Sequence, residues 1–304
     1  MAASSSTVQP ASSRVVQRLT SGGHGRDLLG VLPFFLFALL FLFAPAASIA
    51  AGSFADNDTG AFTLQNVLNL SRPAILSAYW VSIRISAVTA VLGVVFGFGL
   101  AYAITIGKLP SGVRSALLTF CGVASNFAGV PLAFAFVATI GRLGVITVLL
   151  KNGLGWDLYD AGFSLYTFTG LCIVYLYFQL PLMVLIFTPS LDGLKVSWRE
   201  ACENLGGSTW DYWRHIALPV LTPAFLGAFL LLFGNAFGAY ATAYALTSGQ
   251  INLVTMVIGQ QISGDALHDA GLGNALALGM IAVMTVCIAL YTVLQRRASR
   301  WLRS

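Results

Sequence analysis

Long apolar segments without a charged residue alternate with short polar segments along the 304 residues of the chain. Each charge-free interval holds an apolar run near the roughly 20 residues that a membrane-spanning helix needs. Lipid offers no hydrogen-bond partner to backbone groups, so these runs are expected to be helices. The pattern predicts an all-α integral membrane protein with six spans. They cover about 28–51, 78–106, 116–140, 163–187, 219–246 and 272–294.

Composition and charge agree with this class. The chain is 57% hydrophobic and only 9% charged, whereas a soluble domain carries roughly 25% charged residues. If the N-terminus is cytoplasmic, 12 of the 16 Lys and Arg residues fall on the cytoplasmic side, and the positive-inside rule then places both termini there. The net charge of +5 thus reflects orientation in a membrane and gives no reason to expect a nucleic-acid partner. The basic residues predicted outside are Arg72, Arg84, Arg142 and Lys151.

The ends of the chain differ from its middle. Residues 1–27 are rich in Ser, Gly and Arg and are predicted to be a disordered cytoplasmic tail. A cleaved signal peptide is the alternative, but the first apolar run is long enough to span, which favours an uncleaved helix. Residues 28–296 form the predicted transmembrane domain, and 297–304 a basic cytoplasmic tail suited to anionic lipid. The cysteines fall in spans or on the cytoplasmic side, so we expect packing roles rather than a disulfide framework or metal site. They are Cys121, Cys172, Cys202 and Cys287.

Three polar side chains within the spans are candidates for lining a translocation pathway. Arg84 lies some seven residues into the second span, where a charge is costly; snorkelling to the outer interface is the favoured alternative. Asn126 precedes Gly129 and Pro131, which should break the third span. Gln179 precedes Pro181, which should kink the fourth. For the two amides, helix-to-helix hydrogen bonding or packing is an equally good interpretation.

The second span also carries a small-residue pair. Gly93 and Gly97 are four residues apart, a spacing that lets another helix approach closely. We interpret the pair as a packing feature.

The most polar run is the loop 192–218 between the fourth and fifth spans. Ser197 and Glu200 have the spacing of a capping box, and Gly206-Gly207 offers a left-handed exit from the helix so begun. Ser208 and Asp211 repeat the start signal. The predicted order is helix, glycine break, second helix, and then the fifth span with Pro219 just inside its start. Such a short amphipathic helix could lie on the bilayer or dock to a protein.

The spacing in this loop resembles the EAA motif of permease subunits of type I ATP-binding-cassette (ABC) importers, the MetI-like family. The family pattern is Glu-Ala-Ala, three residues, Gly, nine residues, Ile, one residue and Leu-Pro, and this chain matches its spacing throughout. Cys202 replaces the second Ala of the pattern, and Gly207 replaces an Ala that is frequent at that position. The resemblance extends over 62–294 and is closest to the polyamine (spermidine/putrescine) type, with similar segments at 141–144 and 258–261. Leu143 stands where that type usually has Asn, and 126–134 lacks its Arg-Thr.

This resemblance implies a MetI-like fold and a loop helix that docks in a cleft of an ATPase subunit. The implied partners are an ABC ATPase dimer, a second homologous permease or a second copy of this chain, an extracytoplasmic solute-binding protein, and the bacterial inner membrane. A polyamine-like cargo is favoured; ferric iron, thiamine, phosphonate and sulfate are cargoes of related types. The implied coupling residues are Ser197, Glu200, Ala201, Cys202, Leu205, Gly206, Ile216, Leu218 and Pro219.

Catalytic patterns are absent from the sequence. It has no G-x-x-x-x-G-K-[ST] motif, so ATP and Mg²⁺ are expected on the partner ATPase and no cofactor on this chain. His24, His215 and His268 lie in separate polar segments, which provides no catalytic or metal-binding set and argues against an enzyme. A stand-alone secondary transporter or channel is the rival function. Such proteins place ionisable groups near the bilayer midplane, whereas these spans have only Arg84, near an edge.

Overall fold

The computed structural model describes residues 24–57, 59–107, 109–263 and 269–300. It contains two compact units, Met1–Gly52 and Ser53–Ser304. Most of the predicted N-terminal tail and the last four residues of the predicted basic tail lie outside the described residues.

The described part of the first unit is a single helical segment. Helix α2 (His24–Ala38) passes through a π-helical turn at Leu39–Phe43 into α3 (Ala44–Ser53). The predicted first span is therefore helical. The predicted end of the disordered tail at residue 27 is wrong by one turn, because the structure has helix over 24–27. Extending an existing helix by one turn needs no new nucleus, so polar residues join it at little cost.

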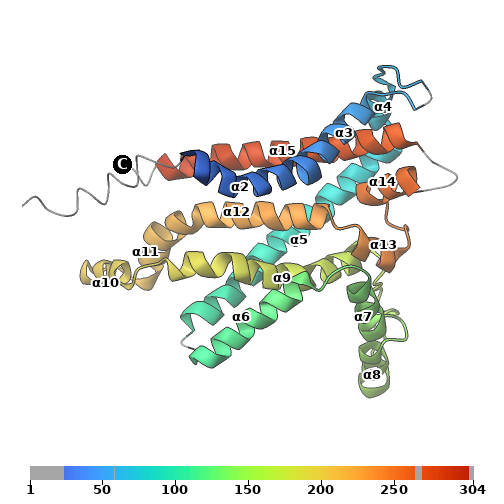
Figure 1. Cartoon of the computed structure of the whole chain (residues 1–304). Helices are drawn as coiled ribbons and strands as arrows, with labels where there is room; N and C mark the ends of the chain where they lie inside the picture. The colour runs from blue at the N-terminus through green and yellow to red at the C-terminus, as the bar shows by residue number, and fades with distance from the viewer. Residues whose placement is uncertain (1–23, 58, 108, 264–268, 301–304) are drawn as a thin grey trace, which may run out of the picture. The chain divides into compact units, whose positions relative to one another are not determined.

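The second unit contains the remaining helices, shown in Figure 1. In chain order they are α4 (Gln65–Leu68), a 3₁₀ turn (Asn69–Ser71), α5 (Pro73–Ile106), α6 (Ser111–Asn126), α7 (Val130–Ile140), α8 (Val145–Leu154), α9 (Phe168–Asp192), α10 (Val196–Asn204), α11 (Thr209–Tyr212), a π-helical turn (Trp213–Ala217), α12 (Leu218–Phe237), α13 (Ala241–Thr247), α14 (Val254–Ser263) and α15 (Ala270–Arg300).

Helices α5, α9 and α12 form the centre of this unit. Two glycines on α5 let α9 come close: a Cβ at Gly93 would lie 2.9 Å from Gln179 Oε1, and one at Gly97 only 2.6 Å from Met183 Cβ. The predicted close approach at the Gly93–Gly97 pair is thus confirmed. Gly99 has no neighbouring atom within 4 Å of its Cβ position, so it takes no part in this contact.

Six helical segments of the described chain are long and apolar enough to cross a membrane, which is the predicted number. They are Val31–Ser53, Pro73–Ile106, Val130–Leu154, Phe168–Asp192, Thr209–Phe237 and Ala270–Arg296.

Two of the predicted spans are divided in the structure. The third, 116–140, is broken between α6 and α7 at Gly129, which has a φ of +77°, so the long apolar segment there begins at Val130 instead. Figure 1 shows α7 leaving in a different direction from α6. The fifth, 219–246, is interrupted between α12 and α13. The predicted break at Gly129 and Pro131 is confirmed, whereas the second interruption was not foreseen.

The fourth and sixth spans are shifted or extended. Helix α9 begins at Phe168 rather than 163, because the Thr167 side chain accepts a hydrogen bond from the Gly170 N–H as its N-cap. It continues without interruption past Pro181 to Asp192. Helix α15 reaches Arg300, so the predicted tail at 297–300 is helical.

Candidate functional site

Helix α10 opens the loop between α9 and α12. The predicted capping box of Ser197 and Glu200 is wrong: the N-cap is Lys195, without a side-chain cap, and Ser197 is the second residue of the helix. The Trp198 N–H bonds to the Lys195 carbonyl at 3.1 Å, so the backbone begins the turn before Ser197 can cap it. Glu200 is left exposed and makes no hydrogen bond or ion pair with any described residue.

The C-terminal end of α10 is fixed by two glycines. Gly206 has a φ of +80°, which confirms the predicted left-handed exit. Its N–H bonds to the Glu203 carbonyl at 3.0 Å, and the Gly207 N–H bonds to the Cys202 carbonyl at 2.9 Å. These are the two hydrogen bonds of a Schellman motif. A Cβ at Gly207 would lie 2.6 Å from Cys202 Sγ, so the turn also needs a small residue there.

The second predicted capping box is confirmed. Ser208 Oγ accepts from the Asp211 N–H at 3.2 Å, and Asp211 Oδ2 accepts from the Ser208 N–H at 2.9 Å. Helix α11 then continues through the π-helical turn Trp213–Ala217 directly into α12. Pro219 lies in the first turn of α12, as predicted, but the second loop helix and the fifth span are one continuous helix.

The loop presents an apolar groove and, on the same helix, a carboxylate without a partner among the described residues. The groove has a volume of about 400 Å³ and lies between α10 and the start of α12. Leu205, at its rim, has 89% of its surface exposed. Glu203, one turn from Glu200, is held by Arg199 at 2.9 Å, and this hydrogen bond raises the pKa of Arg199. Glu200 thus differs from its neighbour in being free for a partner.

The structure brings together only part of the predicted coupling set. Four predicted residues line the groove, and the others are exposed outside it, apart from Gly206, which shapes the turn. The groove residues are Ala201, Cys202, Leu205 and Ile216, joined by Trp198, Gly207 and Val220. The exposed residues outside it are Ser197, Glu200, Leu218 and Pro219.

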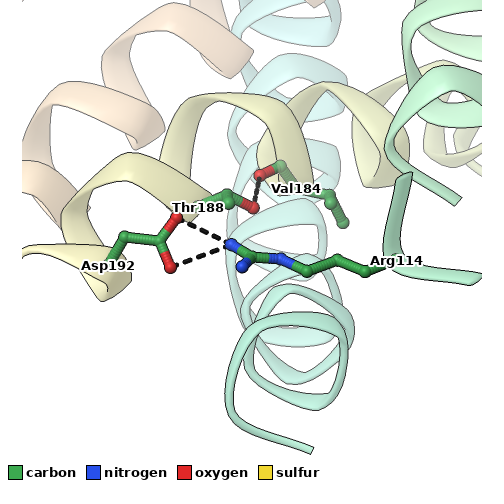
Figure 2. A network of polar contacts seen from close by, with 4 residues as sticks. All are labelled: Arg114, Val184, Thr188 and Asp192. Carbon is green, nitrogen blue, oxygen red and sulfur yellow. Dashed lines mark hydrogen bonds and ion pairs between the residues drawn. The ribbon is translucent and has the colours of Figure 1, made fainter. Parts of the chain in front are cut away.

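An ion pair ties the base of this loop to α6. Figure 2 shows the Arg114 guanidinium facing both carboxylate oxygens of Asp192, the last residue of α9, at 2.9 and 2.7 Å. The two side chains are 35% and 47% exposed, so the pair contributes about 0–1 kcal/mol. One turn before Asp192, the Thr188 hydroxyl donates to the Val184 carbonyl within α9. The loop therefore leaves α9 from a helix end anchored to α6.

The three pathway candidates lie in different surroundings. The Arg84 guanidinium lies 5.0 Å from the centre of the ring of Phe168, the first residue of α9, and snorkelling of Arg84 stays a prediction. Asn126 is exposed and bonds within its own helix, to the Gly122 carbonyl at 2.9 Å. No hydrogen bond among the described residues joins the Arg84 side chain to that of Asn126.

Gln179 is 0% exposed. Its Nε2 donates to Thr89 Oγ1 at 3.1 Å and to the Leu232 carbonyl at 3.5 Å, which links α9 to α5 and α12. Its Oε1 has no hydrogen-bond partner among the described residues. Gln179 thus makes the hydrogen bonds between helices that were the alternative to lining a pathway.

Sequence reasoning missed a second cavity, of about 500 Å³, at the ends of α6 and α12. Its lining includes Ser125, Asn235, Tyr240 and Thr242. A signal was present in the sequence: Asn235 is an amide within a long charge-free apolar run, between Gly234 and Gly238.

The model of one protein family matches most of the chain. The family is described as "Binding-protein-dependent transport system inner membrane component", and the match covers residues 93–304.

Curated relatives carry permease names for several cargoes. The chain is 26% identical over 226 residues to a probable sulfate transport system permease protein of Chlorella vulgaris, covering 73% of this chain and 78% of the relative. It is 29% identical to the thiamine transport system permease protein of Salmonella typhimurium, covering 68% of this chain but only 37% of that relative. It is 23% identical to a spermidine/putrescine transport system permease protein of Haemophilus influenzae, covering 84% and 90%.

The fold matches a solved ABC transporter. A chain of a bacterial ABC transporter involved in the import of the acidic polysaccharide alginate superposes with a TM-score of 0.68 at 17% identity, covering 93% of this chain and 99% of the other. Fold and apolar helices thus define a multi-pass membrane permease of the ABC-importer type. The chain belongs to the family of binding-protein-dependent transport system inner membrane components, a family of transport components rather than enzymes.

Proposed function

We propose that the chain is the permease subunit through which an ATP-driven importer moves a small solute into the cytoplasm, and that α10 couples it to the ATPase. The observation that carries the proposal is the surface of α10. Leu205, almost fully exposed, lies at the rim of an apolar groove, and Glu200 on the same helix is exposed and has no partner among the described residues. Exposed apolar surface of this kind marks an interaction site. The spacing from Glu200 to Pro219 matches the EAA motif, whose helix docks on an ATPase.

The local structure of the loop suits it to transmit force. The Schellman turn at Gly206 and the capping box at Ser208 fix α10 relative to α11. Because α11 continues into α12, a displacement of α10 acts directly on a long apolar helix. ATP and Mg²⁺ bind the partner ATPase in this scheme. The closed ATPase binds one of two conformations of the permease more strongly than the other. Closure therefore shifts the permease population toward that conformation.

Assembly follows from the number of coupling helices. This chain supplies one, and an ATPase dimer has two clefts, so a second permease completes the transporter. A homologous permease is favoured over a second copy by the similarity to the spermidine/putrescine type. Both termini and α10 face the cytoplasm, as the distribution of Lys and Arg indicates. A solute-binding protein delivers cargo at the opposite face.

The favoured cargo is polyamine-like, since the sequence resemblance is closest to that type. Sulfate and thiamine permeases are relatives of comparable similarity, so ferric iron, phosphonate, sulfate and thiamine remain to be compared in uptake assays. A stand-alone secondary transporter or channel is the alternative function, and it needs no ATPase partner.

Co-purification tests the proposal. The chain is tagged and co-expressed with a candidate ABC ATPase and a candidate solute-binding protein from the same genome. It is expected to retain the ATPase in detergent and to show ATP hydrolysis that the loaded binding protein stimulates. If the permease is recovered folded without an ATPase, and transport persists when ATP is depleted but a proton gradient is kept, the alternative replaces the proposal.

A further inference from the structure

Another apolar groove lies between α12 and α15, and we refer to it as the α12–α15 groove. It has a volume of about 600 Å³, and α5 contributes Ile83 to its lining. Val286 and Leu290, which line it from α15, are 67% and 61% exposed. Because these helices are long and apolar enough to cross a membrane, the occupant of the groove is a lipid chain or another helix.

The α12–α15 groove has the length of one leaflet of a bilayer. It follows α15 from Ala282, near the middle of the apolar segment Ala270–Arg296, to Leu294 near the end of that segment. This stretch is about 18 Å of helix, and half of the hydrocarbon core is about 15 Å thick. A partner helix crosses the whole core of about 30 Å, whereas a lipid acyl chain stays within one leaflet. The length of the groove therefore favours an acyl chain.

Tyr291 places a hydroxyl group in this apolar groove. The residue is half-buried, and its Oη lies 3.4 Å from the Cβ position of Gly227 on α12. The hydroxyl has no hydrogen-bond partner among the described residues, and a hydroxyl in apolar surroundings costs free energy unless it is bonded. Tyr is typical of the level at which acyl chains join their headgroups. A phospholipid ester carbonyl at that level could accept the hydrogen bond of Tyr291.

The end of the groove is positively charged. After Leu294, α15 continues with Arg296, Arg297 and Arg300. The three helices that line the groove, α5, α12 and α15, contain no acidic residue. The C-terminal end of α15 carries about half a negative elementary charge, which three arginines outweigh. Basic residues that directly follow a membrane span attract anionic lipid headgroups.

We propose that the α12–α15 groove binds an acyl chain of an anionic phospholipid, with its ester group at Tyr291 and its phosphate at the arginines that end α15. The proposal goes beyond the proposed function, since it requires neither an ATPase nor a particular solute. A zwitterionic phospholipid has the same chains but no net charge, so it binds more weakly. The bound chain fills the space between α12 and α15 and thereby stabilises their packing.

Thermal unfolding of the purified permease in detergent tests the proposal. Phosphatidylglycerol is expected to raise the unfolding temperature by about 4 °C more than phosphatidylcholine with the same chains, because a ligand that binds only the folded chain stabilises it. Leu290→Trp fills the groove and should abolish this difference. Val293→Trp is the matched control and should keep it, since Val293 is 50% exposed on α15 but does not line the groove. Arg296→Gln combined with Arg297→Gln should reduce the phosphatidylglycerol shift to that of phosphatidylcholine.

A photoactivatable phosphatidylglycerol, with the reactive group in its acyl chain, covers the case in which these variants do not fold. Added to membranes that contain the natural chain, it is expected to form adducts within 226–233 and 282–294, the parts of α12 and α15 that line the groove. Equal thermal shifts from the two lipids, an unchanged difference in Leu290→Trp, or adducts spread evenly over the spans would each overturn the proposal. A photoreactive phenylalanine analogue at position 290 that cross-links to a second permease instead of lipid would also overturn it, because a helix would then fill the groove.

Discussion

Replacing Glu200 by Gln is expected to lower ATP-dependent uptake at least tenfold without changing the thermal stability of the chain. Glu200 is exposed and makes no hydrogen bond or ion pair with any described residue, so its loss removes nothing from the fold. When α10 docks on the ATPase as proposed, Glu200 faces the cleft of that subunit. Removing one partner of a charge pair buried in an interface costs about 2–5 kcal/mol. The measurements are solute uptake in cells and the unfolding temperature of the purified permease.

Glu203→Gln is the matched control, on the same helix three residues away. Glu203 pairs with Arg199 at 2.9 Å, and both side chains are 53% exposed. Solvent screens such a pair, so its replacement should leave both the stability of the chain and uptake almost unchanged, with uptake within twofold. If Glu200→Gln transports normally, or if the two variants lose uptake equally, the docking role of Glu200 is wrong.

Replacing Gly97 by Ala is expected to destabilise the permease enough to lower its unfolding temperature and its yield in membranes. The new Cβ would lie 2.6 Å from Met183 Cβ and 2.7 Å from Met183 Cγ. Met183 is fully buried, so the clash can be relieved only by separating α5 from α9. Overpacking of a well-filled core costs about 1–3 kcal/mol. Thermal unfolding in detergent, followed by size-exclusion fluorescence, measures the change.

Gly99→Ala is the control for this prediction. Its Cβ position has no atom of the described chain within 4 Å, and Ala is favoured over Gly in a helix by about 1 kcal/mol. Its unfolding temperature should be equal to or above that of the natural chain. An equal loss of stability in both variants would mean that Gly97 does not set the contact between α5 and α9.

Much of this architecture could be predicted from residue types. Charge-free runs indicated six apolar helices, since lipid leaves the backbone no other way to satisfy its hydrogen bonds. Ser208 and Asp211 predicted a cap correctly because both side chains act within one turn. Ser197 and Glu200 had the same spacing, yet the helix begins earlier, at Val196, with Lys195 as its N-cap. The spacing of a capping box therefore does not by itself determine which residue is the N-cap.

The less predictable features depend on contacts between distant segments. Gln179 is buried because both α5 and α12 pack against α9 around it. The sequence near Gln179 does not predict which helices pack there. The interruption after Phe237 joins that at Gly129 through Thr242, 113 residues along the chain. The cavity that Asn235 lines was overlooked for this reason: it forms where two breaks meet that lie far apart in the sequence.

Docking of α10 on an ATPase can be detected by cross-linking from Leu205. This side chain is 89% exposed, so a photoreactive phenylalanine analogue at position 205 can be accommodated without disturbing the fold. A docked α10 should give an adduct of this chain with the ATPase subunit in whole cells. The same analogue should give no such adduct at Leu143, which is 93% exposed in the predicted outer segment between α7 and α8. Adducts with lipid alone at position 205, or an ATPase adduct from position 143, would contradict the docking of α10.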